Sequence, residues 1–487
     1  MNRALPLLDW EVSQPEKACI VTDEGAYTYR DVASRIRAAA ASLADRVTKG
    51  TRVGLFIDST PNFIVYEYAV FYLGGIVAPI NRALKDAEVQ GIVEHLGLSV
   101  VIADGPLDID GAAHVVEVTG EIPDAATQTS EVPLAEVDPE DGALLLQTSG
   151  STGRPKGVLL TVRNLSSNYD ASYRWLGIGK EDRILLTLPV FNTYALNQGI
   201  NMLAMTGATL RLLRRFSPEG VARALDDIRP TFIPFVPTMV TRLYQAGIRY
   251  DEPVRIGIGA ASSPANIASD AWTVFPRATL YMGYGLTEAT AITSVNHIGT
   301  ADDNNGDFRS AGIIVPGQQV RIGGASGEDD RGEVLIRGAN VFSAYVGTTE
   351  PRPVEDGWLD TGDIGRFDEN RCLHIVDRKR ELIIRGGQNI YPSEIERALS
   401  SHPAVLEVSV VGAADEDLGE VPVAFVTLRR DADTDGDGLV GWLTSRLAAF
   451  KLPAQVHLID EFPKTATGKI RKLDLKERAA AARKVRG

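Results

Sequence analysis

The stretch Thr148-Ser-Gly-Ser-Thr-Gly-Arg-Pro-Lys-Gly157 comes directly after the apolar run Ala143-Leu-Leu-Leu-Gln147. Its glycines let backbone N–H groups approach an anion without obstruction by a Cβ atom. Its hydroxyls add hydrogen-bond donors, and its lysine adds a point charge suited to phosphate. The stretch therefore predicts a phosphate-binding loop at the end of a buried strand, formed by Thr148, Ser149, Gly150, Ser151, Thr152, Gly153 and Lys156.

Two other interpretations of this loop are weaker. A Walker A loop has Ser or Thr directly after its lysine, whereas this chain has Gly157. A flexible Gly/Ser linker rarely follows a buried-strand pattern or ends in such an ordered lysine.

Composition narrows the class of protein. A chain of 487 residues is too long for one hydrophobic core and indicates two or more domains. The net charge of −14 argues against a nucleic-acid partner. The two cysteines, Cys19 and Cys372, lack the spacing of a metal site, and no signal peptide is visible, so we expect a cytoplasmic protein. The longest apolar stretch, 64–80, contains Glu67 and Pro79, which indicates a core helix rather than a membrane span.

The first 290 residues alternate between β-branched runs and helical patterns, which is typical of parallel βαβ units and predicts an α/β fold. Short strands with Gly turns over 308–376 indicate a β-rich subdomain. The predicted strands are 52–58, 99–104, 142–148, 183–189, 208–213, 231–236, 254–259 and 279–283, with helices at 30–46, 60–73, 217–228 and 238–246.

The composition changes after Asp377, and the later pattern predicts a small α+β domain. We expect an N-terminal domain over 1–378, a mobile C-terminal domain over 379–487 and a hinge at 378–381. Ser393 and Glu396 have capping-box spacing and predict the start of a helix. The acidic stretch 431–438 resembles a calcium loop but lacks the glutamate that such a loop needs, so we expect no calcium site.

Four further segments accompany the phosphate loop. They are Gly283-Tyr-Gly-Leu-Thr-Glu288, Gly357-Trp-Leu-Asp-Thr-Gly-Asp363, 377–394 with its Arg385-Gly-Gly-Gln-Asn389, and Pro463-Lys-Thr-Ala-Thr-Gly-Lys469. In order and content the five resemble the adenylate-forming superfamily of acyl-CoA synthetases, adenylation domains and luciferases. The resemblance extends from about Tyr27 to Leu473.

The resemblance implies ATP, Mg²⁺ and CoA as cosubstrates and cofactor. It implies that Lys469 is the catalytic lysine of adenylation, that Thr287 binds the α-phosphate, and that Glu288 binds the Mg²⁺ ion. It also implies that Asp363 and Arg378 bind the ribose hydroxyls. The adenine slot lies between Tyr284 and the stretch Gly259, Ala260 and Ala261, with Gly285 beside it.

The resemblance also implies a second geometry for thioester formation. The C-terminal domain rotates about Arg380, withdraws Lys469, and places Gly386 and Gly387 beside a channel for the thiol arm of CoA. We expect the remaining lysines of this region, Lys464, Lys472 and Lys476, to be ordinary exposed side chains.

Leu188-Pro-Val-Phe-Asn-Thr-Tyr-Ala-Leu-Asn197 resembles a segment of 4-coumarate-CoA ligase-like enzymes, with Asn192 in place of a histidine. Amino-acid-activating domains usually carry Asp there, so neutral Asn192 argues against an amino-acid substrate. The pocket is mostly apolar and aromatic, which favours a hydrophobic or aryl monocarboxylate. Its expected residues are Phe191, Asn192, Tyr194, Asn197, Phe235, Val236, Thr238, Gly257, Ala260, Ala261, Met282 and Gly283.

The sequence thus favours a ligase that activates such an acid as an acyl-adenylate, releases pyrophosphate and transfers the acyl group to CoA. The main alternative is transfer to a separate carrier protein. A luciferase-like oxidase and a non-catalytic acyl-nucleotide sensor are less favoured, the latter because Lys156, Glu288, Asp363 and Lys469 are all retained.

Overall fold

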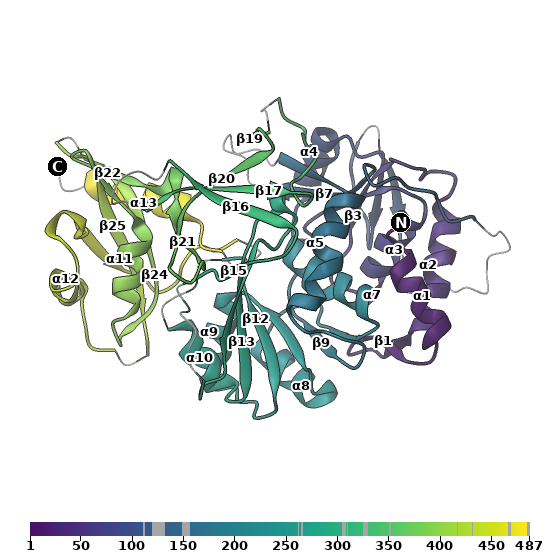
Figure 1. Cartoon of the computed structure of the whole chain (residues 1–487), viewed down its shortest axis with the longest axis horizontal. Helices are drawn as coiled ribbons and strands as arrows, with labels where there is room; N and C mark the ends of the chain where they lie inside the picture. Colours follow the sequence, from purple (N-terminus) through teal and green to yellow (C-terminus); the bar gives the residue numbers. More distant parts are fainter. Residues whose placement is uncertain are drawn as a thin grey trace.

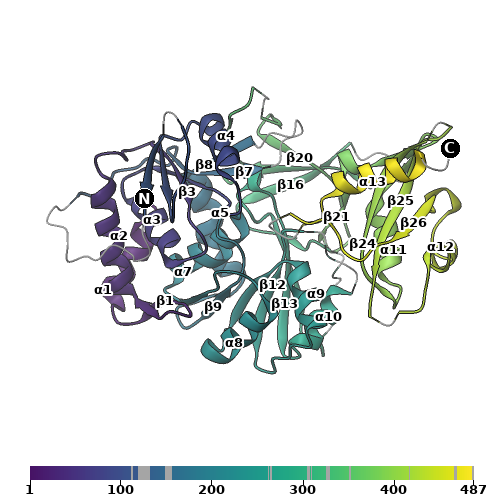
Figure 2. The ribbon, with the colours of Figure 1, turned by 180° about the vertical axis from the view of Figure 1, so that it is seen from behind.

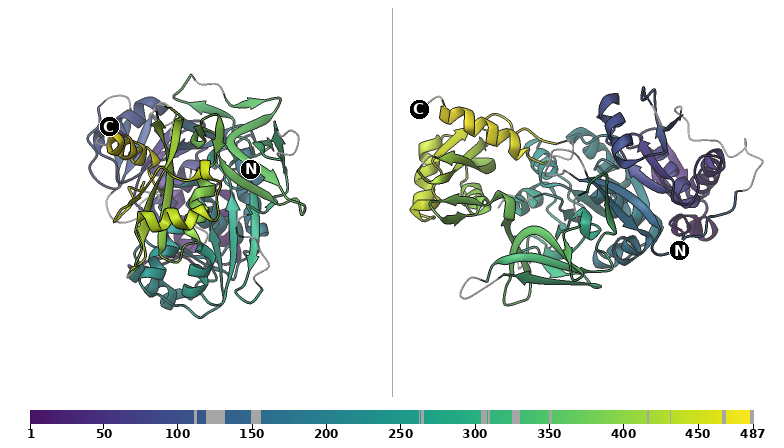
Figure 3. Two further views of the ribbon diagram at one scale, coloured as in Figure 1. Left: turned by 90° about the vertical axis from the view of Figure 1, so that its left-hand side faces the viewer. Right: turned by 90° about the horizontal axis from the view of Figure 1, so that it is seen from above.

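The structure is a computed structural model. It describes residues 1–110, 113–118, 132–148, 156–261, 263, 266–303, 308, 310–324, 330–349, 352–415, 417–430, 432–465 and 469–484. Three sheets form the larger N-terminal part, and a fourth sheet forms a separate unit at the other end of the molecule (Figure 1, Figure 2). The right-hand view of Figure 3, seen from above, places the chain's N-terminus and this C-terminal unit at opposite ends.

The first sheet has the strand order β18-β8-β7-β4-β3-β5-β6. Its strands β7, β4, β3, β5 and β6 are parallel, and β8 and β18 continue it in antiparallel fashion. The predicted phosphate loop is the connection between β7 and β8. The strands are β3 (Arg52–Phe56), β4 (Ile76–Pro79), β5 (Val100–Ala103), β6 (His114–Glu117), β7 (Gly142–Thr148), β8 (Lys156–Thr161) and β18 (Ala344–Val346).

The second sheet has the strand order β15-β14-β13-β12-β11-β9-β10-β1-β2 and is parallel from β13 to β1. In such a sheet, loops at the carboxyl ends of the strands form the ligand site. The strands are β1 (Ala18–Val21), β2 (Ala26–Thr28), β9 (Arg183–Leu186), β10 (Thr209–Leu212), β11 (Phe232–Phe235), β12 (Val254–Ile258), β13 (Ala278–Tyr284), β14 (Ser294–Gly299) and β15 (Ile313–Ile314).

Helices between these strands bury their apolar faces on the two sheets. α3 is buried from Pro61 to Phe71, which confirms the core helix expected in the apolar stretch 64–80. The stretch ends in strand β4, which the sequence pattern did not predict. The helices are α1 (Leu5–Ser13), α2 (Tyr29–Leu43), α3 (Pro61–Tyr72), α4 (Asp86–Leu96), α5 (Val162–Trp175), α6 (Thr193–Ala195), the π-helix η2 (Leu196–Asn201), α7 (Met202–Thr206), α8 (Pro218–Ile228), α9 (Pro237–Gln245), α10 (Ile267–Val274) and the 3₁₀ turn η3 (Thr287–Ala289).

The third sheet is antiparallel, with β16, β17, β20 and β19 in order and β21 paired to β20. It is the β-rich subdomain that the sequence predicts. Its strands are β16 (Gln318–Gly323), β17 (Gly332–Gly338), β19 (Val354–Glu355), β20 (Trp358–Phe367) and β21 (Leu373–Arg378).

The C-terminal unit has its own sheet, in the order β23-β22-β25-β24 with β26 paired to β25, and its own buried clusters around Ile395 and Phe425. A hydrophobic core of its own is typical of a separate domain. Its elements are η4 (Lys379–Glu381), β22 (Ile383–Arg385), β23 (Gln388–Ile390), α11 (Pro392–Ser400), β24 (Val405–Asp415), β25 (Gly419–Leu428), α12 (Gly436–Thr444), η5 (Ala449–Lys451), β26 (Gln455–Leu458) and α13 (Lys472–Lys484).

These elements confirm the predicted α/β class and every predicted strand and helix of the first 290 residues, with ends shifted by up to three residues. Among the described residues, no helix is long and apolar enough to cross a membrane. The acidic stretch after β25 leads into α12, where the side chain of Asp435 accepts a 2.8 Å hydrogen bond from the Gly438 backbone and caps the helix.

The predicted capping box of Ser393 and Glu396 is wrong. Helix α11 begins at Pro392, because proline is favoured in the first turn and fixes the start one residue earlier. The Ser393 hydroxyl instead donates to the Val376 carbonyl, and Glu396 accepts a 2.8 Å hydrogen bond from the Val410 backbone.

The expectation that Lys464 and Lys472 are ordinary exposed lysines is also wrong. The Lys472 ammonium lies 2.8 Å from Glu381 and 3.1 Å from Glu396. Lys464 lies 2.9 Å from Glu407. Both lysines meet carboxylates that are distant in sequence, so only the packing of the C-terminal unit reveals their partners. Lys476 is exposed, as expected.

Candidate active site

Tyr284, Asp363 and Arg378 form a connected polar group at the junction of the sheets. The Tyr284 hydroxyl donates a 2.6 Å hydrogen bond to Oδ2 of Asp363. Arg378 Nε lies 3.2 Å from the other carboxylate oxygen, because β20 and β21 pair these two residues directly. Burial raises the pKa of Asp363, and the Arg378 charge and the Tyr284 hydrogen bond oppose that rise.

Glu288 and Lys156 approach one another across Tyr345. The Tyr345 hydroxyl lies 3.3 Å from Glu288 Oε1, and the Lys156 ammonium lies 5.2 Å from the centre of the Tyr345 ring. Burial raises the pKa of Glu288, and Arg378 and Lys156 are among the groups that lower it. The predicted metal ligand therefore lies beside the lysine of the predicted phosphate loop. Thr287 immediately precedes it in η3.

Lys469 reaches this group from the C-terminal unit. Desolvation by the surrounding protein is the main cause that lowers the pKa of its ammonium, and Arg378 lowers it further, whereas Asp363 and Glu288 raise it. By accessible surface the residue is nevertheless exposed, so its ammonium is partly surrounded by protein and still open to a ligand. Its backbone is fixed by a 3.1 Å hydrogen bond from its N–H to the Thr465 hydroxyl.

The motif around Tyr284 depends on a glycine. A methyl group on Gly285 would lie 1.4 Å from the Ala291 carbonyl oxygen, so the turn after β13 closes only without a side chain there. On the neighbouring strand, Ala260 follows β12 with a φ of +65°, a strained conformation for a residue with a Cβ. The two predicted sides of the adenine slot are therefore formed by the turns after β12 and β13, and both turns are sterically constrained.

The predicted acid pocket is built around the Tyr194 ring. A methyl group on Gly259 would lie 3.6 Å from Tyr194 Cζ and 3.6 Å from the Gly283 carbonyl oxygen. A methyl group on Gly257 would lie 3.1 Å from the Tyr194 hydroxyl. Tyr194, Gly257, Gly259 and Gly283 therefore come together, from three different elements.

Other expected pocket residues have different environments. Asn192 caps α6, since its Oδ1 accepts a 2.9 Å hydrogen bond from the Tyr194 N–H. Asn197 is fully buried and accepts a 2.7 Å hydrogen bond from Ser172 of α5. Phe235 and Val236 are buried at the end of β11, whereas Met282 is partly exposed on β13.

The Gly386–Gly387 pair forms the turn of the β22–β23 hairpin, with φ values of +55° and +80°. Both residues are exposed, and Figure 1 places β22 on the side of the C-terminal unit away from the N-terminal part. Arg380 is exposed in η4, directly after β21. The roles predicted for Gly386, Gly387 and Arg380 concern the second arrangement of the N-terminal part and the C-terminal unit, which is expected for thioester formation.

Some predicted residues cannot be placed. Ser149, Gly150, Ser151, Thr152 and Gly153 lie outside the described residues, while Thr148 ends β7 and Lys156 begins β8. Sequence reasoning missed Tyr345, which lies beside Lys156 only because β18 pairs with β8. Among the described residues, no group of three or more His, Cys, Asp or Glu side chains could hold a metal ion.

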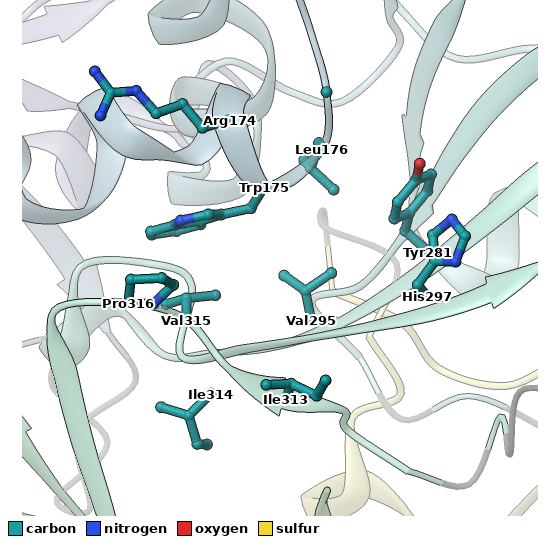
Figure 4. Close-up of a pocket in the computed structure, with 11 residues that line it drawn as sticks. Arg174, Trp175, Leu176, Tyr281, Val295, His297, Ile313, Ile314, Val315 and Pro316 are labelled. Carbon is teal, nitrogen blue, oxygen red and sulfur yellow. The ribbon is translucent and has the colours of Figure 1, made fainter.

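A surface pocket of about 470 Å³ lies apart from all the predicted site residues (Figure 4). It lies between the end of α5 and strands β13 to β15, and its lining includes Trp175, Tyr281 and His297. Tyr281 and Met282 are consecutive on β13 and so face opposite sides of the sheet.

Known proteins and protein families match this chain over almost its whole length. The AMP-binding enzyme family matches residues 8–346, and the AMP-binding enzyme C-terminal domain matches residues 394–469. A 3-[(3aS,4S,7aS)-7a-methyl-1,5-dioxo-octahydro-1H-inden-4-yl]propanoyl:CoA ligase of Mycobacterium tuberculosis is 32% identical over an alignment of 497 positions. The alignment covers 95% of this chain and 96% of the relative.

A feruloyl-CoA synthase of an Amycolatopsis species is 32% identical over 474 residues, which cover 93% of this chain and 94% of the relative. Among solved structures, ATP-bound MatB from Rhodopseudomonas palustris matches with a TM-score of 0.87 at 26% identity, over 98% of each chain.

Proposed function

The chain belongs to the AMP-binding enzyme family, and we propose that it is an acid–thiol ligase that joins a hydrophobic or aryl carboxylic acid to CoA with consumption of ATP. One observation carries the proposal. Lys469 comes from the C-terminal unit and lies within electrostatic reach of Asp363, Glu288 and Arg378 of the N-terminal part. Movement of the C-terminal unit would bring the Lys469 cation to the nucleotide site for one half-step and remove it for the other, which suits a reaction in two half-steps.

In the first half-step the acid's carboxylate oxygen attacks the α-phosphorus of ATP, the bond to pyrophosphate breaks, and an acyl-adenylate forms. Negative charge grows on the α-phosphate, and preorganised cations stabilise it. Lys469 bridges the carboxylate and this phosphate, and Thr287 donates to it. The loop with Lys156 holds the outer phosphates, and Asp363 and Arg378 hold the ribose.

Glu288 suits a Mg²⁺ ion. Its carboxylate is a hard oxygen ligand, and its Oε1 lies 3.3 Å from the Tyr345 hydroxyl. The same glutamate lies beside Lys156, where the outer phosphates are expected. When bound, the ion neutralises phosphate charge, and Tyr345 keeps the carboxylate oriented toward that side.

In the second half-step the CoA thiol attacks the acyl carbonyl, loses its proton and displaces AMP. For this step we propose a rotation about 378–381, with Arg380 in the hinge and domains at 1–378 and 379–487. The rotation withdraws Lys469 and brings the exposed turn at Gly386 and Gly387 to the thiol channel. The ion pair between Arg429 and Asp270, with 3.5 Å between Nη2 and Oδ1, joins the two parts in the present arrangement and has to break.

The class of acid follows from the pocket. Tyr194, Phe235, Val236 and Met282 supply apolar and aromatic surface, and the glycines on β12 leave room for a flat or bulky group. The relatives named as CoA ligases support CoA as the acceptor and give no support to a carrier protein. The free thiols of Cys19 and Cys372 suit a reducing cytoplasm.

The test is ATP–pyrophosphate exchange across a panel of aryl, alkyl and amino acids, followed by product analysis with CoA. We expect exchange that depends on an aryl or hydrophobic acid, and a thioester only when CoA is added. Absence of exchange with every acid would contradict ligase activity and favour a nucleotide-binding sensor.

A further inference from the structure

Lys472 is held by two carboxylates from different elements of the C-terminal unit. Its ammonium lies 2.8 Å from Oε2 of Glu381 in η4 and 3.1 Å from Oε1 of Glu396 in α11. The three side chains are between 18% and 27% exposed, so solvent screens their charges only in part. Desolvation lowers the pKa of the Lys472 ammonium, but the charges of Glu396 and Glu381 outweigh it and raise the pKa above its ordinary value. Lys472 is therefore a permanent cation that joins the start of α13 to two other elements.

These ion pairs attach one end of the turn that carries Lys469. The two arms of this turn are bonded to one another, because Lys464 and Ile470 form an antiparallel bridge and the Thr465 N–H donates a 2.7 Å hydrogen bond to the Lys469 carbonyl. The bonds hold the described parts of the arms at a fixed distance from each other. The direction in which the turn points is then decided by its attachments, and Lys472 is the attachment that follows Lys469.

Through Glu381 the attachment leads to the nucleotide site. Glu381 ends the hinge turn η4, and Arg378, three residues before it, lies 3.2 Å from Asp363. Lys469 likewise lies three residues before Lys472. Three residues of extended chain span at most about 11 Å, so the ion pair limits how far Lys469 can move from Arg378. One contact thus connects the expected catalytic lysine with the group that orients the ribose-binding carboxylate.

The second carboxylate, Glu396, is itself held in place. The Oε1 atom that faces Lys472 also accepts a 2.8 Å hydrogen bond from the Val410 N–H of β24. Helix α11, which carries Glu396, is bonded to the strand before the hinge, since the Ser393 N–H donates a 2.9 Å hydrogen bond to Asp377. Lys472 therefore pairs with carboxylates whose own positions are restricted.

We propose that Lys472 is a positioning residue for adenylation, because its ion pairs with Glu381 and Glu396 hold the turn that carries Lys469 against the hinge. Lys472 faces carboxylates of its own unit, so its effect on the substrate passes through Lys469. A misplacement of about 1 Å at a reacting group can cost about 10²-fold in rate. The proposal rests on the ligase function proposed above and adds a residue that its first half-step needs.

The experiment compares Lys472→Met, which removes the charge, with Lys472→Arg, which keeps it. ATP–pyrophosphate exchange gives kcat and the KM for ATP, and single-turnover thioester formation from a pre-made acyl-adenylate measures the second half-step. Lys451→Met is the matched control, because it removes another lysine of the C-terminal unit, 21% exposed and 2.6 Å from Glu394 of the same helix α11. Thermal unfolding checks that each variant folds.

Lys472→Met should lower kcat for exchange by about tenfold or more and change the KM for ATP by less than about threefold, because the groups expected around the nucleotide stay in place. Thioester formation should stay within about twofold, since the proposed rotation withdraws Lys469 in that step. Lys472→Arg should restore exchange to within about threefold of the unmodified enzyme, and Lys451→Met should leave exchange unchanged.

A double variant distinguishes positioning from general damage. If Lys472 acts through Lys469, adding Lys472→Met to Lys469→Ala should cause little further loss of adenylation, because residues that act as a unit are not additive. A merely structural role predicts the same fold-loss with and without Lys469. If Lys472→Met does not fold, Glu381→Gln tests the same link with a smaller loss of the same pattern, because the pair with Glu396 is kept.

The outcomes separate the two proposals. Unchanged exchange, a parallel loss of both half-reactions, or an equal fold-loss with and without Lys469 would overturn the positioning role and leave the ligase function standing. Absence of exchange with every acid in the unmodified enzyme would overturn the ligase function and the positioning role with it.

Discussion

The Tyr284 hydroxyl donates a 2.6 Å hydrogen bond to the Asp363 carboxylate, across 79 residues of sequence. Arg378 lies on the other oxygen of the same carboxylate, so Asp363 is oriented from two sides. A buried carboxylate held in this way is preorganised to accept hydrogen bonds from a diol. The relationship gives Tyr284 a second proposed role, in addition to the proposed contact with the adenine ring.

Tyr284→Phe should raise the KM for ATP by roughly tenfold, because a hydrogen bond to a charged group contributes about 1.5–3 kcal/mol. The ring that faces the adenine is kept, so kcat should change less than KM. Steady-state kinetics with varied ATP measures the effect. Tyr281→Phe, on the same strand but in the separate surface pocket, is the control and should leave the KM for ATP unchanged. Equal losses in both variants would argue against the role of the Tyr284 hydroxyl.

Lys469→Ala should reduce adenylation by about 10² or more, as expected for the loss of a preorganised charge. Thioester formation from a pre-made acyl-adenylate should largely survive, since the proposed rotation withdraws Lys469 in that step. Pyrophosphate exchange and single-turnover thioesterification measure the two halves separately. The exposed Lys476→Ala is the control. A parallel loss in both half-reactions would remove Lys469 from its assigned role.

Gly387→Asn should stop thioester formation while pyrophosphate exchange continues. Asparagine tolerates the positive φ of this turn better than other side chains, so the hairpin should still form, while the added amide obstructs the thiol arm. Gly50→Asn, at an exposed position of the N-terminal part with a φ of +84° and open space around it, is the matched control and should support both steps. Loss of exchange together with thioester formation would show that the turn serves the first step or the fold.

Asn192→Asp should lower kcat/KM for the preferred aryl acid by tenfold or more. Aspartate can still cap α6, so the fold is kept, but a second carboxylate beside the substrate repels it. Asn192→His should be milder. Ser217→Asp changes another neutral N-cap, at α8, and should leave acid kinetics unaltered. Robust turnover of free α-amino acids by the unmodified enzyme would refute the neutral-pocket interpretation.

Glu67→Gln should raise the melting temperature at pH 8 and have a smaller effect at pH 5. Burial raises the pKa of Glu67 to about 8, although Arg3 lowers it. The folded state therefore holds a proton that the unfolded chain releases above its ordinary pKa of 4.5, so stability falls as pH rises between these two values. Thermal unfolding from pH 5 to 8 measures this, with the exposed Glu369→Gln as control. A constant difference between Glu67→Gln and the unmodified protein across this range would contradict the raised pKa.

The sequence alone determined the elements and the motif residues. Alternating β-branched and helical patterns located most strands of the parallel sheets, because hydrophobic periodicity is a local property of the chain, but they missed β1, β4 and β6. The phosphate loop was predicted from its residue types, and the roles of Glu288, Asp363 and Lys469 were predicted from the resemblance of the motifs that contain them. Local patterns failed where a partner lies far away. The spacing of Ser393 and Glu396 indicated a capping box, but both side chains bond to other strands.

Only the tertiary structure decided how these residues meet. Tyr345 joins Lys156 to Glu288 because β18 pairs with β8, and Lys472 lies between Glu381 and Glu396 because α13 packs on the C-terminal sheet. Hydrogen bonds and packing act over a few ångströms in space, whatever the separation along the chain. A sequence therefore indicates which chemical groups a site contains, but the fold decides which of these groups contact one another.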